Sequence, residues 1–128
     1  MTENQLAKVV VDASFKIHTE LGPGLLESVY EAVLAHELER RGLRVTKQRA
    51  IPVIYEGVQL DVGFRADMIV NGLLLVEVKS IEAIAPVHLK QVRTYLRLTD
   101  LRLGLLINFN VNLIKDGIRR VVNGLPES

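Results

Sequence analysis

The chain predicts a single α/β domain in which a mixed β-sheet is flanked by helices, with the element order α-α-β-β-β-α-β-β. Apolar residues recur at helical spacing over residues 5–41, then alternate with the period of a strand over residues 45–79. After residue 79 a helix separates two apolar strands, and such a crossover connection makes the third and fourth strands parallel. A chain of 128 residues can bury one core, so residues 1–128 are expected to form one domain.

The first part of the chain predicts two helices. Residues 5–21 carry one apolar face, with Thr2 and Asn4 before it as candidate caps. The sequence GPG at residues 22–24 ends this helix, because glycine frees the backbone and proline lacks a hydrogen-bond donor. A second helix is expected over residues 25–41, closed by Gly42.

The middle and C-terminal parts predict the sheet. Strands are expected at 45–55 and 58–70 around a Glu56-Gly57 turn, and Gly63 indicates a bulge or a close backbone approach. The Asn71-Gly72 turn leads to a third strand, 73–79. Further along the chain, the pattern predicts a helix at 86–98, an internal strand at 103–109, a hairpin of 113–115 with 118–122 through Asp116-Gly117, and a frayed tail at 122–128.

Composition excludes several classes of protein. The chain has no cysteine, which excludes disulfides and thiolate zinc sites. No window offers 18 uncharged apolar residues, and the N-terminus lacks a basic start, so we expect no membrane segment and a cytoplasmic location. The net charge of +1 does not by itself indicate nucleic-acid binding. Two basic clusters stand out, although most such clusters are simply solvated faces; they are Arg40, Arg41, Arg44, Lys47 and Arg49, and Lys90, Arg93, Arg97 and Arg102.

The strand at 73–79 ends with two opposite charges on one face. Side chains alternate across a strand, so Glu77 and Lys79 share a face while Val76 and Val78 take the other. Asp67 lies on the preceding strand, across the Asn71-Gly72 turn. This layout is typical of a metal-dependent phosphodiesterase site.

Magnesium suits such a site because it takes a few carboxylate oxygens and keeps several waters. Asp67 and Glu77 are the expected ligands, with the Val78 carbonyl as a third, and Mn²⁺ is a possible substitute. Lys79 would then lie beside the attacking water. Spacing alone leaves an alternative equally open, namely a structural salt bridge between Glu77 and Lys79 or between Arg65 and Asp67.

Two helices offer further candidates. Glu27 opens the second helix, where it either complements the helix dipole or holds a metal-bound water. Gln91 and Tyr95 share a face of the later helix, and Gln91 can bond the phosphate or the water, whereas a helical tyrosine is more usually a core residue. Candidates for contacts with nucleic acid are Tyr95, His88, Lys90, Arg93 and Arg65.

Other chemistries lack their signatures. His18, His36 and His88 do not have the spacing of zinc ligands. No Gly-Lys-Ser/Thr follows the glycines at 22–24, and no serine has a nucleophile-elbow context. The sequence therefore does not support a zinc hydrolase, a nucleotide-dependent enzyme or a serine hydrolase.

Five motifs taken together resemble a known family. Residues 24–30, GLLESVY, match the Gly-x-x-Glu-x-x-Tyr signature of the GxxExxY proteins. The remaining motifs follow in order, and they are RAD at 65–67, VEVK at 76–79, QVRTYL at 91–96 and GLLINF at 104–109. The resemblance covers residues 13–122, and the only departure from the superfamily name is Ala66, which stands where the name has proline.

That family is placed in the PD-(D/E)xK, or restriction-endonuclease-like, nuclease superfamily. The resemblance implies a mixed sheet with flanking helices, a magnesium site, and a catalytic set of Glu27, Asp67, Glu77 and Lys79 assisted by Gln91. It implies a hydrolase acting on nucleic acid, DNA more than RNA, and leaves open a homodimer that would lengthen the binding groove. The competing hypothesis is a non-catalytic nucleic-acid-binding or protein-interaction module that retains the fold.

Overall fold

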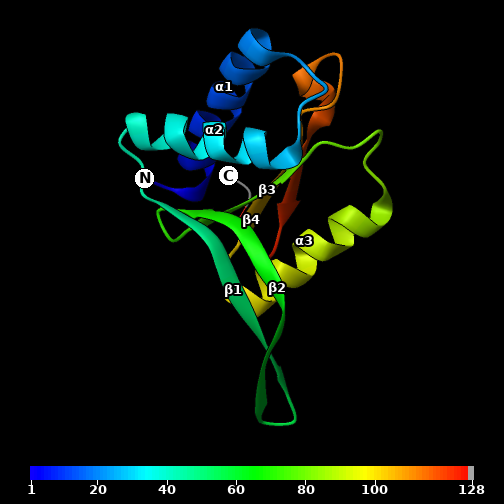
Figure 1. The fold of residues 1–128 in the computed structure, drawn as a ribbon. Coiled ribbons are helices and arrows are strands. Elements are labelled where there is room, and N and C mark those ends of the chain that lie inside the picture. Colours follow the sequence, from blue (N-terminus) through cyan, green and yellow to red (C-terminus); the bar gives the residue numbers. More distant parts are fainter. Residues whose placement is uncertain (127–128) are drawn as a thin grey trace.

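The computed structural model describes residues 1–126 and contains a five-stranded sheet with helices on both faces (Figure 1). The elements in chain order are α1 (Glu3–Leu21), α2 (Glu27–Arg40), β1 (Val45–Tyr55), β2 (Val58–Val70), β3 (Leu74–Lys79), α3 (Pro86–Thr99), β4 (Leu103–Asn108), a 3₁₀ turn (Ile114–Gly117) and β5 (Ile118–Val122). The predicted fold class and element order are confirmed, apart from the segment before β5.

The strands lie in the order β1-β2-β3-β4-β5, and only β3 and β4 run parallel. The crossover through α3 therefore has the expected result. Helices α1 and α2 pack on one face of the sheet, against Val76, Val78 and their neighbours. Helix α3 covers the other face through Val92, Tyr95 and Leu96. Glu77 and Lys79 thus lie on the α3 side of the sheet.

The turn between α1 and α2 is fastened by Tyr30. This side chain is fully buried, its hydroxyl donates to the Gly22 carbonyl at 2.5 Å, and it accepts the Leu25 N–H at 3.2 Å. Its ring stacks on Phe109 with centroids 4.6 Å apart. The predicted start of α2 at residue 25 is wrong by two residues, because extended Leu26 is the N-cap and Glu27 begins the helix. Tyr30 therefore fixes the place at which Glu27 enters the fold.

The predicted hairpin between 113–115 and 118–122 is wrong. Residues 114–117 form a 3₁₀ turn, and β5 pairs with β4 from Ile107–Ile118 to Leu103–Val122. Gly117 has no positive φ; instead, a Cβ there would come within 2.2 Å of the Asn108 carbonyl oxygen. The glycine serves a close approach between β4 and the 3₁₀ turn, which local sequence does not reveal.

The chain end is more ordered than the predicted frayed tail. Val122 is paired in the sheet, and Asn123 donates its backbone N–H to Arg102 O at 2.8 Å and its side chain to Leu101 O at 3.0 Å. Residues 127–128 of the predicted tail lie outside the described residues. Within residues 1–126, no helix has the length and apolar character needed to cross a bilayer.

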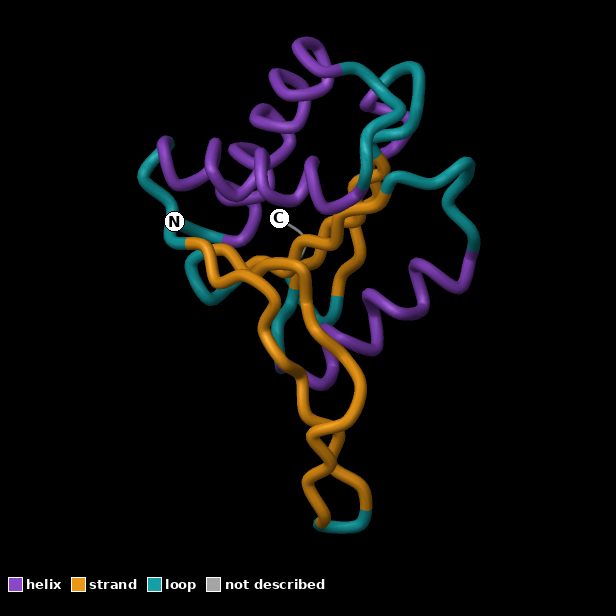
Figure 2. The backbone as a smooth tube through the Cα atoms, viewed as in Figure 1, coloured by secondary structure: helices purple, strands orange, loops and turns teal. Residues whose placement is uncertain are grey.

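Hairpin β1–β2 is much longer than the part of the sheet that the helices cover. β3 pairs with β2 only over Met68–Val76, Ile69–Leu75 and Val70–Leu74. The rest of the hairpin extends past both helical layers as a twisted two-stranded ribbon (Figure 2).

Gly117→Ala should destabilise the protein more than Gly104→Ala. The new methyl group at residue 117 meets a backbone oxygen that cannot move without disturbing β4, whereas at residue 104 it meets the Val92 side chain at 2.8 Å. Overpacking of this kind costs about 1–3 kcal/mol, and we expect Gly117→Ala at or beyond the upper end and Gly104→Ala near the lower end. Urea denaturation measures both, and equal stabilities of the two variants would contradict the close-approach argument.

Candidate active site

Strands β2 and β3 separate at Asp67 and Glu77. Their ladder ends at the Met68–Val76 pair. Beyond it, the Asp67 N–H donates to Glu77 Oε2 at 3.1 Å, and the Val78 N–H donates to Asp67 Oδ2 at 2.8 Å. Each carboxylate therefore accepts a backbone hydrogen bond from the strand opposite.

A kink in β1 helps to free the Asp67 N–H. Lys47 pairs with Met68 and Arg49 with Ala66, but Gln48 between them does not pair with Asp67. Gln48 has φ 50°, a left-handed conformation that turns its backbone away from a regular ladder. The Asp67 amide is thus available to Glu77, because an amide without a partner in the ladder needs another acceptor.

The Val78 carbonyl faces the gap between the strands. Lys79 O accepts the Phe109 N–H at 2.9 Å, so its carbonyl points toward β4. Backbone groups of consecutive strand residues point in opposite directions, and the Val78 N–H already reaches Asp67 on the β2 side. The Val78 carbonyl therefore points to the β2 side as well, where β2 no longer supplies a donor.

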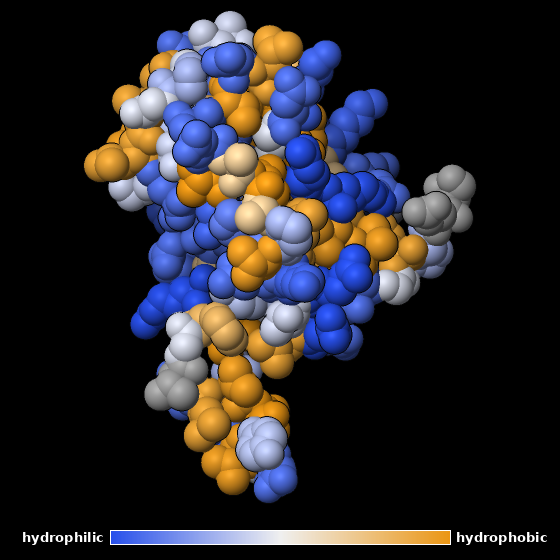
Figure 3. Space-filling view, turned by 90° about the vertical axis from the view of Figure 1, so that its right-hand side faces the viewer, coloured by the Kyte–Doolittle hydropathy of each residue, from blue (hydrophilic) through white to orange (hydrophobic). Residues whose placement is uncertain are grey.

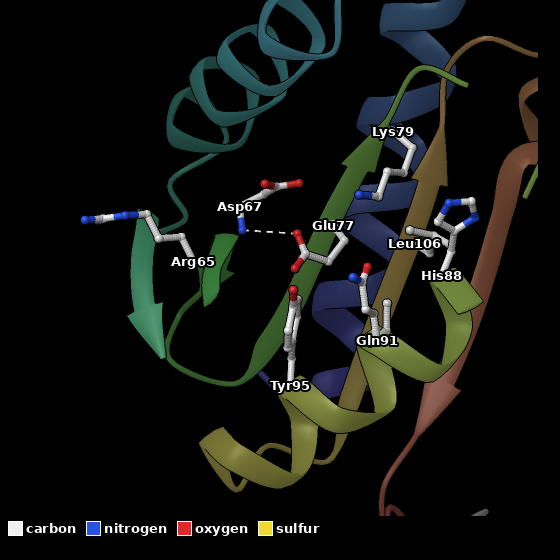
Figure 4. Close-up of a pocket in the computed structure, with 9 residues that line it drawn as sticks. Arg65, Asp67, Glu77, Lys79, His88, Gln91, Tyr95 and Leu106 are labelled. Atoms are coloured by element: carbon white, nitrogen blue, oxygen red, sulfur yellow. Dashed lines mark hydrogen bonds between the residues drawn. The ribbon is translucent and has the colours of Figure 1, made fainter. Parts of the chain in front are cut away.

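A pocket of about 70 Å³ opens beside this gap. Figure 4 shows the Lys79 amine and the Gln91 amide pointing toward the acidic pair from β3 and α3, with the Tyr95 hydroxyl below Glu77. The lining residues are Arg65, Asp67, Glu77, Lys79, His88, Gln91, Val92, Tyr95 and Leu106. Seven of the predicted site residues therefore lie together.

The pKa of Glu77 is raised to about 9. Burial is the largest cause, the hydrogen bonding and charge of Asp67 add to it, and the Asp67 N–H and Lys79 oppose it. Glu77 is only 5% exposed, so its carboxylate is poorly solvated. Burial also raises the pKa of Tyr95, and the charges of Glu77 and Asp67 add to this shift. Burial and the neighbouring acids thus both favour the protonated forms of Glu77 and Tyr95 in the pocket.

The salt-bridge alternative does not describe this site. Among the described residues, ion pairs within 4 Å include neither Glu77 nor Lys79. Arg65 does not pair with Asp67 either, since its guanidinium donates to the Gln48 carbonyl at 3.2 Å. The half-buried Lys79 amine therefore faces the pocket without a carboxylate in ion-pair contact.

Glu27 lies next to the pocket but does not line it. Its Oε2 accepts the Ser80 N–H at 3.3 Å, one residue after Lys79. Ser80 Oγ donates to the Leu25 carbonyl at 2.6 Å, so the start of α2 is tied to the end of β3. Within residues 1–126, no three His, Asp or Glu side chains lie close enough together to form a complete metal-ligand set.

Two residues around the pocket were missed by sequence reasoning. Glu31 is half-buried; burial raises its pKa, Gln48 opposes this through a hydrogen bond, and the charges of Asp67 and Glu27 raise it further. Its position four residues after Glu27, on the same helix face, was an available signal. Asn108 is fully buried and clamps Ile81 by accepting its N–H at 3.1 Å and donating to its carbonyl at 3.0 Å. No local sequence pattern predicts that Asn108 would hold Ile81 in this way.

The residues predicted to contact phosphates lie at two separate places, the pocket and a groove along α3. Arg65 and His88 line the pocket, and His88 Nδ1 also accepts the Ala85 N–H at 2.8 Å. Lys90 and Arg93 lie instead in a separate groove on the outer side of α3, together with Leu89, Thr94 and Arg97. In the first basic cluster, Arg41 is paired with Asp12 and Glu37, so it is largely committed to structural ion pairs.

The sheet order, the helices on both faces and the paired acids at a strand separation define an α/β domain with an acidic pocket at the end of its central strands. Residues 4–121 match the sequence model of the PD-(D/E)XK nuclease superfamily, and the chain belongs to this superfamily. Membership implies nucleic acid as a partner and divalent metals as the usual cofactors. No curated protein and no solved structure gave a significant match.

Glu77→Gln should stabilise the metal-free protein at pH 8. A folded-state pKa of about 9 against an ordinary value of 4.5 means that the folded chain binds more protons between these two pH values. The contribution of Glu77 to stability is therefore fully present below pH 4.5 and is lost as the pH rises through 9. A glutamine removes this loss while its oxygen can still accept the Asp67 N–H.

Thermal melts from pH 5 to pH 9 in a chelator measure the effect. A gain of about 1 kcal/mol at pH 8 raises Tm by roughly 4 °C, and the gain should shrink toward pH 5. The exposed Glu20→Gln is the control and should leave the profile unchanged. A Glu77→Gln variant less stable than the parent at pH 8 would mean that the buried carboxylate is not a destabilising charge.

Proposed function

We propose that this protein is a magnesium-dependent nuclease that hydrolyses phosphodiester bonds of nucleic acid, with DNA the preferred substrate over RNA. The observation that carries the proposal is the reciprocal pair Asp67–Glu77 at the β2–β3 gap, with the Lys79 amine in the same pocket. Within the superfamily we infer kinship with the GxxExxY proteins from residues 24–30.

The donor set fits a divalent cation. Two carboxylates and the Val78 carbonyl converge on the gap, and Mg²⁺ is commonly held by one or two carboxylates plus waters. Burial and the neighbouring Asp67 raise the pKa of Glu77, and a cation bound between the two acids would favour the ionised carboxylate. Asp67, Glu77 and Val78 would hold Mg²⁺, or Mn²⁺ in its place, and Glu27 would hold a metal-bound water from its position beside Ser80.

When bound, the metal supplies charge neutralisation on the phosphate and lowers the pKa of a water. Lys79 orients the attacking water and stabilises charge on the phosphoryl oxygens, because its ammonium has no carboxylate in ion-pair contact. Gln91 donates its amide to a non-bridging phosphate oxygen or to the water. Tyr95 shields Glu77 from bulk water through its pairing with Phe64, whose ring lies 5.0 Å away.

Substrate contacts beyond the reacting phosphate come from polar and basic side chains on two sides of the pocket. Arg65 and His88 stand at its rim, while Lys90 and Arg93 offer a second phosphate contact along α3. Such contacts position the backbone without reading its sequence, so we expect little sequence specificity from this domain alone.

The test is a magnesium titration coupled to cleavage assays on single- and double-stranded DNA and RNA. Lys79→Ala should keep the magnesium-dependent rise in Tm yet lose roughly 10²–10³-fold in cleavage rate, as expected for removing one group that stabilises transition-state charge. Asp67→Asn should lose both the rise in Tm and cleavage. Lys8→Ala, an exposed lysine on α1, is the matched control and should behave as the parent.

Two results would defeat the mechanism. Cleavage by Lys79→Ala at the parental rate would remove the lysine from it. Magnesium binding by the parent without cleavage of any polymer would favour the non-catalytic binding module instead.

A further inference from the structure

The outer end of the β1–β2 hairpin has a face that no other element covers. We call residues 53–60 the arm; its strands pair through Val53–Leu60, Ile54–Gln59 and Tyr55–Val58 around the Glu56-Gly57 turn. Figures 1 and 2 show the arm reaching beyond the helices on either side of the sheet. Ile54 and Tyr55 are each 66% exposed, and Val58 is 57% exposed.

The apolar side chains of the arm are sorted onto one side of the ribbon. Directly paired residues share a face, as do residues two apart on one strand. Val53, Tyr55, Val58 and Leu60 therefore form one face without a polar group except the Tyr55 hydroxyl. We call this the apolar face of the arm.

The opposite side of the arm is of mixed character. It carries Ile54 and Gln59, and the Gln59 amide donates to Asp61 Oδ1 at 3.1 Å. The space-filling view shows that hydrophobic residues dominate the surface of the protruding hairpin, in contrast to the mainly hydrophilic body above it (Figure 3).

An isolated two-stranded ribbon with such a face is marginal in water. Independent stability requires a third strand or packing against another layer. Contiguous exposed apolar surface of this kind marks an interaction site on a soluble protein. The apolar face of the arm is therefore expected to contact another molecule.

The charges of the hairpin disfavour nucleic acid as the binding partner of the apolar face. Residues 51–64 contain Glu56 and Asp61 and no lysine or arginine. A polyanion binds through neutralisation of its phosphates by basic side chains, which this segment does not offer. The apolar face itself carries no charge, so it fits another uncharged, apolar surface.

We propose that the apolar face of the arm packs against the same face of a second copy of this chain. A twofold contact brings identical surfaces together, and an apolar face without charge meets no like charge on a second copy of itself. In this face-to-face arrangement Asp61 stays on the outer, solvated side, so the two copies do not bury like charges.

The exposed area of the apolar face limits the size of the contact. Tyr55, Val58 and Leu60, the last 41% exposed, each offer on the order of 100 Å² of uncovered surface. Pairing two copies would therefore bury roughly 600–800 Å², less than the roughly 1,200 Å² of stable complexes. The dimer is weak and forms only as the protein concentration rises.

Sedimentation equilibrium of the full chain, without metal or nucleic acid, tests the proposal from about 5 µM to about 1 mM, the range in which a small interface associates. The mean mass should rise from 14.3 kDa toward twice that value. The triple variant Tyr55→Thr, Val58→Thr, Leu60→Thr should stay monomeric, since threonine keeps the β-propensity and removes the apolar face. Ile54→Thr is the matched control, because Ile54 has the same exposure as Tyr55 but lies on the other face.

Single-cysteine variants give a second readout, since the chain has no cysteine of its own. Leu60→Cys should form a disulfide-linked dimer on mild oxidation at high concentration, whereas neighbouring Gln59→Cys, on the opposite face, should link far less. Far-UV circular dichroism checks that each variant is folded.

Three outcomes would overturn the proposal. These are a parent that stays monomeric over the whole range, equal cross-linking at residues 59 and 60, or an unchanged mass together with loss of nucleic-acid binding in the triple variant. The last outcome would assign the arm to the nucleic acid. None of these readouts involves catalysis, so the arm contact and the nuclease proposal stand or fall separately.

Discussion

The exchange of backbone hydrogen bonds between Asp67 and Glu77 is the constraint on which the rest of the site depends. At this point β2 and β3 stop pairing, and each of the two carboxylates accepts a backbone N–H from the opposite strand. A sheet that merely ended here would leave amides without acceptors, at a cost comparable to a lost hydrogen bond for each. The carboxylates satisfy those amides and, in the same arrangement, are brought together at the mouth of the pocket.

Elements on both sides of the sheet hold this separation in place. Tyr30 fastens the turn before α2, and Glu27 and Ser80 tie α2 to the end of β3. On the β4 side, Asn108 clamps Ile81 after the strand has ended. These contacts fix the backbone around Lys79 without using the Lys79 side chain, which leaves the ammonium free to face the pocket. A functional group is most effective when its surroundings, rather than its own bonds, hold it in position.

The sequence predicted the parts of the site that obey local periodicity. Strand alternation placed Glu77 and Lys79 on one face, the Asn71-Gly72 turn brought Asp67 alongside, and helical spacing aligned Gln91 with Tyr95. Those rules act over a few residues and survive in most tertiary contexts. Adjacent helical positions point in different directions, however, and this is why Lys90 lies in another groove although it neighbours Gln91.

What the sequence did not predict depends on contacts between distant segments. An Asp-Gly pair favours a hairpin, yet Gly117 is required by the nearby Asn108 carbonyl, which only the folded chain brings there. The left-handed Gln48 is likewise invisible in a strand-like sequence. Glu31 is a different kind of miss, since its spacing from Glu27 placed both acids on one helix face from the start. For Gly117 and Gln48, the position in the folded chain rather than the local sequence pattern decides what the residue does.

Hairpin β1–β2 connects the acidic pocket, through Asp67, with the apolar face of the arm. β3 supports β2 over only three residue pairs, and Asp67 is the first residue beyond that support. From Asp67 outward, β2 pairs with β1 alone, through a strand kinked at Gln48, although Ala66 and Phe64 of β2 still pack on the α3 side of the sheet. Asp67 therefore lies where β2 loses β3 as a neighbour and depends instead on β1 and on packing at the α3 side.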